Sequence, residues 1–258
     1  MTALPWILTG VAVVALVLVV VAARSLVLRR QRGGADRLAR TLHLNARWWK
    51  DQRAKDGELL YVALGDSAAQ GVGASQPSRS YVGLIAQHLR QRTGRSVRVV
   101  NLSISGARLR EVIALQLAPL RLLSPDIVTV AVGANDMPTF ERDRFTRELA
   151  EVFDSLPAGS IVAEMPSFYL GSSERNVRAA NAIVHRLAAE HGFDVAPLHA
   201  RTRRQGAALY ALNRVSVDFF HPNDRGYRVW ASAFLPLVDR VVAYTSEDRP
   251  NDGDGGLA

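Results

Sequence analysis

The sequence predicts an α/β fold: a three-layer α/β/α sandwich with a mostly parallel five-stranded sheet, preceded by an N-terminal transmembrane helix. Two observations predict it. After Gly57, short runs rich in Val, Leu and Ile alternate with longer amphipathic stretches. Such alternation is typical of βαβ units, in which helices cover both faces of a parallel sheet. Before this region, residues 1–23 carry no charged side chain.

The predicted strands are short and apolar, as strands buried on both faces of a sheet are. They are Leu59–Leu64, Val97–Leu102, Ile127–Val132, Ile161–Glu164 and Asp194–Pro197. The predicted helices are Tyr81–Gln91, Leu109–Leu120, Arg142–Phe153, Glu174–His191 and Asp224–Tyr244. Together these elements predict one compact domain over residues 57–245. The polar, glycine-rich tail 246–258 is predicted to be disordered.

The N-terminal stretch from Pro5 to Ala23 is apolar, and only Thr9 and Gly10 interrupt it. At about 1.5 Å per residue, a helix of this length spans roughly 28 Å, close to the hydrocarbon thickness of a bilayer. We therefore predict that residues 1–28 form a transmembrane anchor. A signal segment cleaved after Ala23 is the alternative, but the run lacks a preceding Lys or Arg and is long for a signal segment.

The net charge of +8 is located in residues 24–55, which hold ten Arg or Lys against two Asp. The remainder, 56–258, has 22 basic and 22 acidic residues. A basic segment beside an apolar stretch indicates contact with a membrane surface, whereas a nucleic-acid-binding fold spreads its basic residues over the folded surface. The charge bias predicts a single-pass membrane protein with its domain on the cytoplasmic side. An extracytoplasmic or secreted domain is the alternative.

Residues 29–56 are predicted to be a basic juxtamembrane linker. Within them, residues 35–55 have the pattern of an amphipathic helix, with Leu38, Leu42 and Trp49 at helical spacing. Two interpretations are open. The helix lies in the lipid headgroup layer with its tryptophans as interfacial anchors, or it packs on the domain.

The residues that several kinds of catalytic or binding site require are absent from this sequence. There is no cysteine, which excludes disulfides, thiolate metal sites and a cysteine nucleophile. The sequence contains no H-E-x-x-H zinc motif, no phosphate-binding G-x-x-x-x-G-K-[ST] loop and no G-x-S-x-G elbow. Gly71-Val72-Gly73 is not followed by the third glycine of a dinucleotide loop. No metal or cofactor is therefore expected.

Four polar blocks stand where the carboxyl ends of parallel strands converge, the edge at which such sheets bind ligands. They are Gly65-Asp66-Ser67, Asn101–Gly106, Gly133–Asp136 and Asp218–His221. A serine hydroxyl becomes a useful nucleophile when an adjacent base takes its proton, and imidazole titrates near neutral pH. We predict Ser67 as the nucleophile, His221 as the general base and Asp218 as the carboxylate that orients the histidine.

These blocks resemble the SGNH hydrolases, also called the GDSL esterase/lipase family, over residues 58–244. The resemblance implies a flavodoxin-like sandwich and an oxyanion hole formed by two backbone N–H groups and one side-chain amide. The four signature residues would be Ser67, Gly106, Asn135 and His221, of which the first three would bind the oxyanion. The chain departs from the family at Ala68, where leucine is frequent.

Two further acids in these blocks are interpreted as structural. Asp66 is predicted to brace the Ser67 turn through backbone N–H groups, and Asp136 to support the loop of Asn135. The other five histidines have no comparable neighbours in the sequence and are assigned to the surface or to helices.

The resemblance implies a carboxylic ester hydrolase that acts through an acyl-enzyme on lipid or other small-molecule acyl esters. One alternative is a carbohydrate O-acetylesterase of the cell envelope, and another is a non-catalytic, membrane-tethered binding module. Phe140, Phe168 and Tyr169 lie in loops expected to line the substrate pocket. With only two lysines against thirty arginines, the composition indicates a bacterial source.

Overall fold

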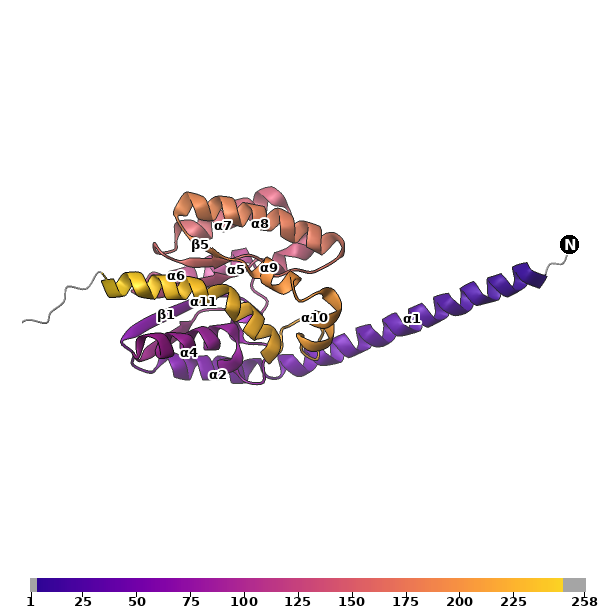
Figure 1. The fold of residues 1–258 in the computed structure, drawn as a ribbon, viewed down its shortest axis with the longest axis horizontal. Coiled ribbons are helices and arrows are strands. Elements are labelled where there is room, and N and C mark those ends of the chain that lie inside the picture. Colours follow the sequence, from indigo (N-terminus) through magenta and orange to yellow (C-terminus); the bar gives the residue numbers. More distant parts are fainter. Residues whose placement is uncertain (1–3, 248–258) are drawn as a thin grey trace, which may run out of the picture.

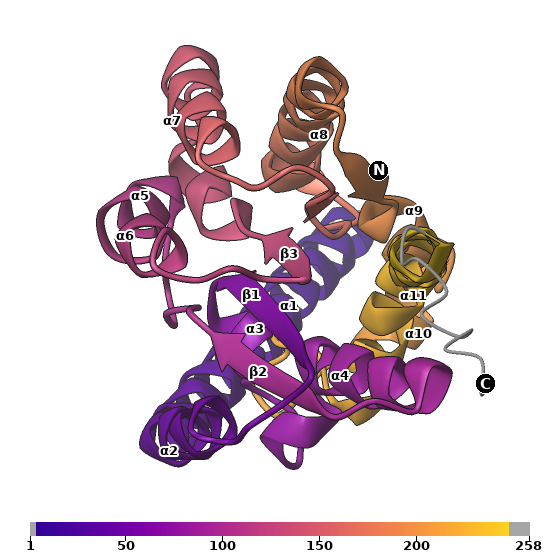
Figure 2. The ribbon, with the colours of Figure 1, turned by 90° about the vertical axis from the view of Figure 1, so that its left-hand side faces the viewer.

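A computed structural model describes the backbone of residues 4–247; most side chains of residues 4–30 and those of 244–247 are outside the description. Five parallel strands form one sheet in the order β2-β1-β3-β4-β5 (Figure 2). The strands are β1 Leu59–Gly65, β2 Val97–Asn101, β3 Ile127–Ala131, β4 Ile161–Ala163 and β5 Asp194–Ala196. The predicted parallel five-stranded sheet is confirmed: each strand starts at the predicted residue and ends one residue from the predicted end.

Helices cover both faces of the sheet (Figures 1 and 2). One face carries α4 Tyr81–Thr93 and α11 Asp224–Glu247, and the other carries α5 Leu109–Leu115, α6 Leu117–Leu120, α7 Arg142–Asp154 and α8 Gly171–His191. Shorter elements are α3 Ser67–Gln70, α9 Leu198–Arg203, α10 Ala207–Asn213, and the 3-10 helices η1 Pro77–Arg79 and η2 Ala134–Thr139. Two helices, α1 Leu4–Ala39 and α2 Leu42–Arg53, precede the sheet.

Side chains of β1 alternate between two separate cores. Tyr61 and Ala63 pack with α2, α4 and α11, whereas Val62 and Leu64 pack with α5, α7 and α8. All four side chains are fully buried. A strand buried on both faces has no polar side, which is why β1 appears in the sequence as a continuous apolar run.

The predicted helix over residues 109–120 is in fact two helices, α5 and α6, that meet at Gln116. The Gln116 side chain is buried and bonds both polar backbone groups of Gly65: it accepts from the Gly65 N–H at 3.0 Å and donates to the Gly65 C=O at 2.8 Å. Apolar periodicity continues across such a break, so the sequence pattern did not indicate it. Helices α3, α9 and α10 were missed because each is shorter than two helical turns.

The amphipathic segment 35–55 is also divided. Helix α1 ends at Ala39, and α2 starts at Leu42 after a turn in which Thr41 Oγ1 donates to the Leu38 carbonyl at 2.7 Å. Of the two interpretations, the structure shows packing on the domain. Trp49 is only 3% exposed, joins the core beneath α4 and α11, and donates its indole N–H to the Gln70 carbonyl at 3.0 Å.

No helix among the described residues is both long and apolar enough to count as a membrane span. The anchor predicted for residues 1–28 therefore stays a prediction. At the other end, α11 continues to Glu247, two residues into the segment predicted as a disordered tail. The remaining residues of that tail, 248–258, lie outside the described residues.

Replacing Trp49 with alanine should destabilise the domain by about 3–5 kcal/mol, because it removes a buried indole and leaves a cavity. The neighbouring Trp48 is partly exposed and is the matched control. Urea unfolding of Trp49→Ala and Trp48→Ala measures both effects. Equal losses for the two variants would contradict the docking of α2 through Trp49.

Candidate active site

The predicted site lies where the chain changes direction across the sheet. From β1 the chain moves to β2 on one side, and then returns to β3 on the other side of β1. Gly65 pairs with Ala131 at the carboxyl ends of β1 and β3. The loops that follow these two strands diverge, which opens the crevice where doubly wound sheets bind ligands. Ser67 follows β1 and Asn135 follows β3, so both are placed at this crevice.

The structure brings Ser67, His221 and Asp218 together in one hydrogen-bonded chain. His221 Nε2 lies 2.8 Å from Ser67 Oγ, and His221 Nδ1 lies 2.5 Å from Asp218 Oδ2. An ionised carboxylate only accepts hydrogen bonds, so Nδ1 carries the ring proton and Nε2 is left to accept from the serine hydroxyl. This is the arrangement of a nucleophile, a base and an orienting acid.

Asp218 is buried and is held by its own backbone turn. Its Oδ1 accepts from the backbone N–H groups of Phe220 and His221, each at 3.1 Å, while Oδ2 faces the imidazole. Burial opposes ionisation of this carboxyl, but the hydrogen bond from His221, together with the bonds from the two backbone N–H groups, outweighs it and lowers the pKa of Asp218. The carboxylate is thus ionised and available to orient His221.

Asp66 braces the Ser67 turn, as the sequence predicted. Its Oδ1 accepts from the Ala68 N–H at 2.9 Å and caps the short helix α3, of which Ser67 is the first residue. Burial raises the pKa of Asp66 to about 6. Burial likewise raises the pKa of Asp136 to about 6, and this carboxyl accepts from the Leu109 N–H at 3.3 Å. Both acids hold the backbone of a loop in place, and neither takes the position of Asp218 in the chain of hydrogen bonds.

The three predicted oxyanion donors differ in whether they already donate hydrogen bonds within the protein. Within the described part of the chain, no acceptor is recorded for the backbone N–H of Ser67 or of Gly106. Asn135, in contrast, donates both amide hydrogens, to Asp66 Oδ2 at 3.1 Å and to the Ala107 carbonyl at 3.0 Å. Gly106 has φ of +80°, which favours glycine, and open space where a Cβ would be. The positive φ therefore accounts for a glycine at this position.

A cavity of about 200 Å³ opens beside Ser67 and His221. Its walls come from the loop after β4, helix α10, the loop before His221, and α11. The aromatic lining residues are Phe168, Tyr169, Tyr210, Phe219, Phe220 and Trp230. Phe168 and Tyr169 lie in the cavity, as predicted, whereas Phe140 packs against Phe145 in the core. Among the described residues, no group of acids and histidines is arranged to hold a metal ion.

Glu174 holds the cavity loop in place and was missed as a functional residue. Its buried carboxylate accepts from the backbone N–H groups of Phe168 and Tyr169 at 2.8 and 3.0 Å, and from Ser167 Oγ at 3.0 Å. His199 Nε2 approaches the other oxygen at 2.9 Å. Tyr169 has φ of +65°, a conformation that costs energy in a residue with a side chain and that these bonds hold. An acid in the first turn of a helix was the available indication in the sequence.

Helix α1 touches the loop that carries Asp218. Gly34 of α1 lies so close to this loop that a Cβ on it would be 2.3 Å from the Val217 carbonyl oxygen and 2.7 Å from the Asp218 Cα. Gly73 approaches the same loop from the other side, where a Cβ would be 2.9 Å from the Cβ of His221. Gly73, one of the glycines that do not form a nucleotide loop, therefore packs against His221.

Comparison with known proteins identifies the class. Residues 63–229 match the GDSL-like lipase/acylhydrolase family. The chain belongs to this family and is a carboxylic ester hydrolase.

Individual relatives are similar to the chain in sequence or in fold. A lipase from Streptomyces rimosus is 27% identical over 70% of this chain and 86% of its own length. The structure is similar to that of LAE5, an alpha/beta hydrolase enzyme from the metagenome of Lake Arreo, at 22% identity and a TM-score of 0.60, over 73% of this chain and 99% of that one. It is also similar to a catalytic mutant of Axe2, an acetylxylan esterase from Geobacillus stearothermophilus, at 22% identity and a TM-score of 0.60, over 71% and 95% of the two chains.

Replacing Gly34 with alanine should lower kcat/KM on a soluble ester by about 10-fold or more, because the added methyl group displaces the backbone that carries Asp218. Gly33 has open space around it, so Gly33→Ala is the matched control and should retain activity. Steady-state kinetics of both variants with p-nitrophenyl acetate measure the difference. Full activity in Gly34→Ala would show that α1 does not hold the loop.

Proposed function

We propose that the chain is a serine-dependent ester hydrolase that acts through an acyl-enzyme on lipid or other acyl esters with an apolar acyl chain. The observation that carries the proposal is the chain of hydrogen bonds from Ser67 through His221 to Asp218 at the mouth of an apolar cavity. A non-catalytic binding module would not need the serine, the base and the orienting acid at hydrogen-bonding distance.

The reaction proceeds in two steps. Ser67 Oγ attacks the ester carbonyl carbon while His221 Nε2 takes the hydroxyl proton, and Asp218 stabilises the resulting imidazolium. Collapse of the tetrahedral intermediate breaks the bond to the alcohol, which receives the proton from His221. A water molecule then attacks the acyl-enzyme, with His221 again as the base, and releases the acid and the free serine.

Negative charge on the carbonyl oxygen is stabilised by the N–H groups of Ser67 and Gly106 and by the amide of Asn135. The two backbone donors have no acceptor recorded in the described structure, which suits them to this task. Asn135 must turn one hydrogen away from Asp66 or Ala107 to take part. Catalytic hydrogen bonds commonly reach their working geometry only with substrate bound.

The cavity supports an acyl chain longer than acetyl. Its aromatic walls have few polar groups, and burial of apolar surface contributes about 25 cal/mol per Å². A carbohydrate O-acetylesterase is the second candidate, because aromatic side chains such as Tyr169 and Tyr210 are also suited to stacking on sugar rings.

We further propose that residues 1–28 anchor the hydrolase domain in a membrane, with the domain on the cytoplasmic side. The absence of charge in residues 1–23 and the ten basic residues of 24–55 support this. In this arrangement residues 24–55 meet the lipid headgroups at their beginning and join the domain through α2 at their end.

Replacing Ser67 with alanine should lower kcat on p-nitrophenyl acetate by about 10⁴-fold or more, since no nucleophile remains. His221→Ala should have a similar effect. His185 also faces a carboxylate, Glu164 at 2.9 Å, but has no serine beside it, so His185→Ala is the matched control and should retain activity. Equal activity in wild type and Ser67→Ala would refute the serine mechanism.

A series of p-nitrophenyl esters of increasing acyl length tests the substrate class. If the cavity holds the acyl chain, kcat/KM should rise from acetyl to medium chains, by up to roughly fourfold for each buried methylene at about 0.8 kcal/mol. Tyr210→Ala should reduce this gain while leaving acetate hydrolysis nearly unchanged. A sharp preference for acetyl, together with hydrolysis of an acetylated sugar, would favour the carbohydrate candidate.

A further inference from the structure

Exposed apolar side chains stand on the loops and on the helix that form the cavity walls. Leu170 follows the cavity residue Tyr169, and Phe168 of the same loop lies 6.2 Å from Phe220, centroid to centroid. On α10, exposed leucines stand on either side of Tyr210, whose ring lies 5.5 Å from that of Tyr169. We call this set the apolar rim: Leu170, Leu209, Leu212, Val217, Phe219 and Phe220. Large apolar patches on a protein surface are typically interaction sites.

The rim is part of a basic surface. Residues 198–217 contain four arginines and no acidic residue. Of the acids in this region, Glu174 and Asp218 are buried, and Glu174 is paired with Arg203 at 3.1 Å. Asp224, which lines a pocket with Leu212 and Val217, is bonded to Ser75 and Arg79. Apolar side chains flanked by arginines are suited to an interface with anionic headgroups above an apolar interior, which is the chemistry of a lipid surface.

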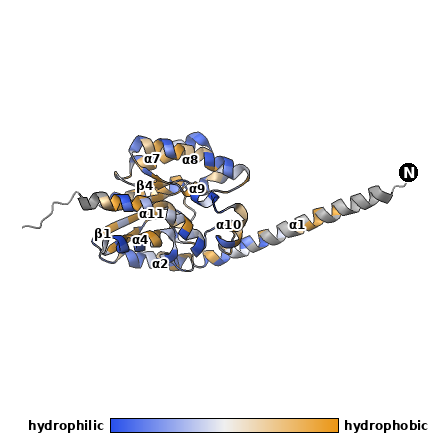
Figure 3. Cartoon of the chain, viewed as in Figure 1, coloured by the Kyte–Doolittle hydropathy of each residue, from blue (hydrophilic) through white to orange (hydrophobic). Residues whose placement is uncertain are grey.

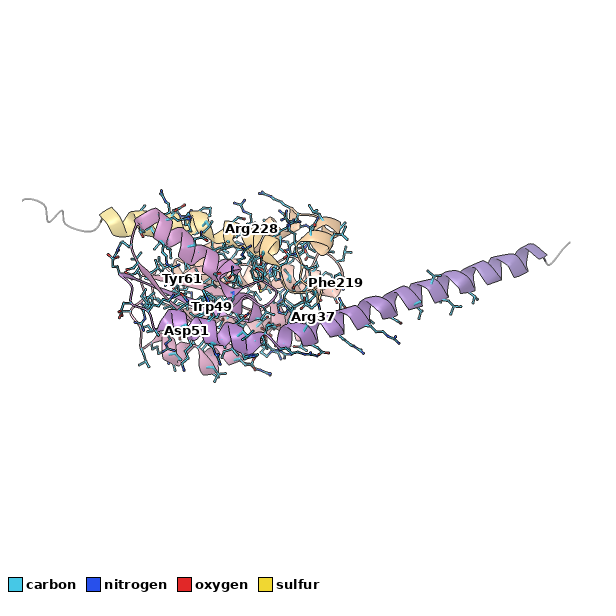
Figure 4. The ribbon with its side chains drawn as sticks, turned by 90° about the horizontal axis from the view of Figure 1, so that it is seen from below. Arg37, Trp49, Asp51, Tyr61, Phe219 and Arg228 are labelled. Atoms are coloured by element: carbon cyan, nitrogen blue, oxygen red, sulfur yellow. The ribbon has the colours of Figure 1, made fainter. Side chains whose placement is uncertain are left out.

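Helix α1 leaves the body at the same end. Figure 1 shows α1 projecting from beside α10, and Figure 4 places Phe219 and Arg37 at the end of the body from which α1 extends. The contact of Gly34 with Val217 and Asp218 fixes this direction relative to the rim. In Figure 3, residues of α1 near the body are hydrophilic, and those farther out that are drawn in colour are mostly hydrophobic.

Helical geometry sets the distance between the rim and the apolar stretch. The eleven residues from Ala23 to Gly34 span roughly 16 Å along the helix. The headgroup layer on each side of a bilayer is about 5–8 Å thick. A helix tilted by the usual 20° or more brings one side of the body still closer to the lipid. Gly34 is therefore held within roughly 8–11 Å of the outer edge of the headgroup layer, a gap that the tilt narrows on one side of the body.

We propose that the apolar rim inserts into an anionic bilayer surface, so that the cavity opens onto the lipid and receives an amphiphilic ester directly from the membrane. This proposal rests on the proposed function and adds the orientation of the site and the source of its substrate. The ester carbonyl would stay at headgroup depth beside Ser67, while the acyl chain enters the aromatic cavity.

Site-specific labelling tests the orientation. Because the chain has no cysteine, Leu212→Cys can be labelled at a single site with an environment-sensitive fluorophore. The matched control is Leu122→Cys: Leu122 is 87% exposed, against 83% for Leu212, but lies in the turn before β3, at the opposite end of the strands. The full-length chain is reconstituted into vesicles of phosphatidylcholine and phosphatidylglycerol with brominated acyl chains.

The label at 212 should shift its emission to the blue and lose most of its fluorescence to the brominated chains, whereas the label at 122 should do neither. Quenching at 212 should be weaker in vesicles of phosphatidylcholine alone, since each arginine near an anionic surface strengthens binding by about fivefold. Equal quenching at both positions, or none at either, would overturn the proposal. So would a blue shift at 212 that follows protein concentration without quenching, because it would assign the rim to a second copy of the chain.

This measurement does not depend on catalysis and can be repeated in Ser67→Ala, where the same quenching pattern is expected. If the label at 212 is quenched but the wild-type chain hydrolyses no ester, the proposed function is refuted and the proposed orientation is retained. A Leu170→Asp/Leu212→Asp variant adds an activity measurement. It should hydrolyse an ester embedded in vesicles at least about tenfold more slowly than wild type, with p-nitrophenyl acetate hydrolysis within about twofold. Unchanged hydrolysis of the vesicle-embedded ester would count against the rim.

Discussion

The hydrogen bond between Ser67 Oγ and His221 Nε2 is the contact on which the site depends. It joins residues 154 positions apart, one on the turn after the first strand and the other on the loop before the last helix. Neither loop carries a complete site by itself. Ser67 follows β1 in the middle of the sheet, and after β5 the chain passes through α9 and α10 before the loop that places His221 beside it. A shift of either loop by about an ångström would break this hydrogen bond between Ser67 and His221.

Separate sets of contacts hold Ser67 and His221 in place. On the serine side, Gln116 bonds both backbone groups of Gly65, and Asp66 caps α3, so the turn is fixed before and after the nucleophile. On the histidine side, the Asp218 turn is packed between Gly34 and Gly73, two glycines that leave no room for a side chain. Helix α1 is thus a structural neighbour of the loop that carries Asp218 and His221.

The cavity wall depends on a different buried group. The Glu174 carboxylate accepts hydrogen bonds from backbone N–H groups of the loop after β4 and faces His199 on α9. A buried carboxylate is stable only when its oxygens are satisfied, so this network ties α8, α9 and the cavity loop into one unit. The aromatic wall beside Ser67 is therefore held by polar contacts that lie outside the cavity.

The sequence by itself determined the layered fold, because apolar runs of strand length alternating with amphipathic helices have one stable arrangement. It also indicated Ser67, Asp218 and His221, since their residue types stand at strand ends where that chemistry converges. Only the tertiary structure decided that α2 docks through Trp49, that Gln116 divides a predicted helix, and that Gly34 meets the catalytic loop. The physical reason is that hydrophobic periodicity records burial along one element, whereas these contacts join elements far apart in the chain and leave no local pattern.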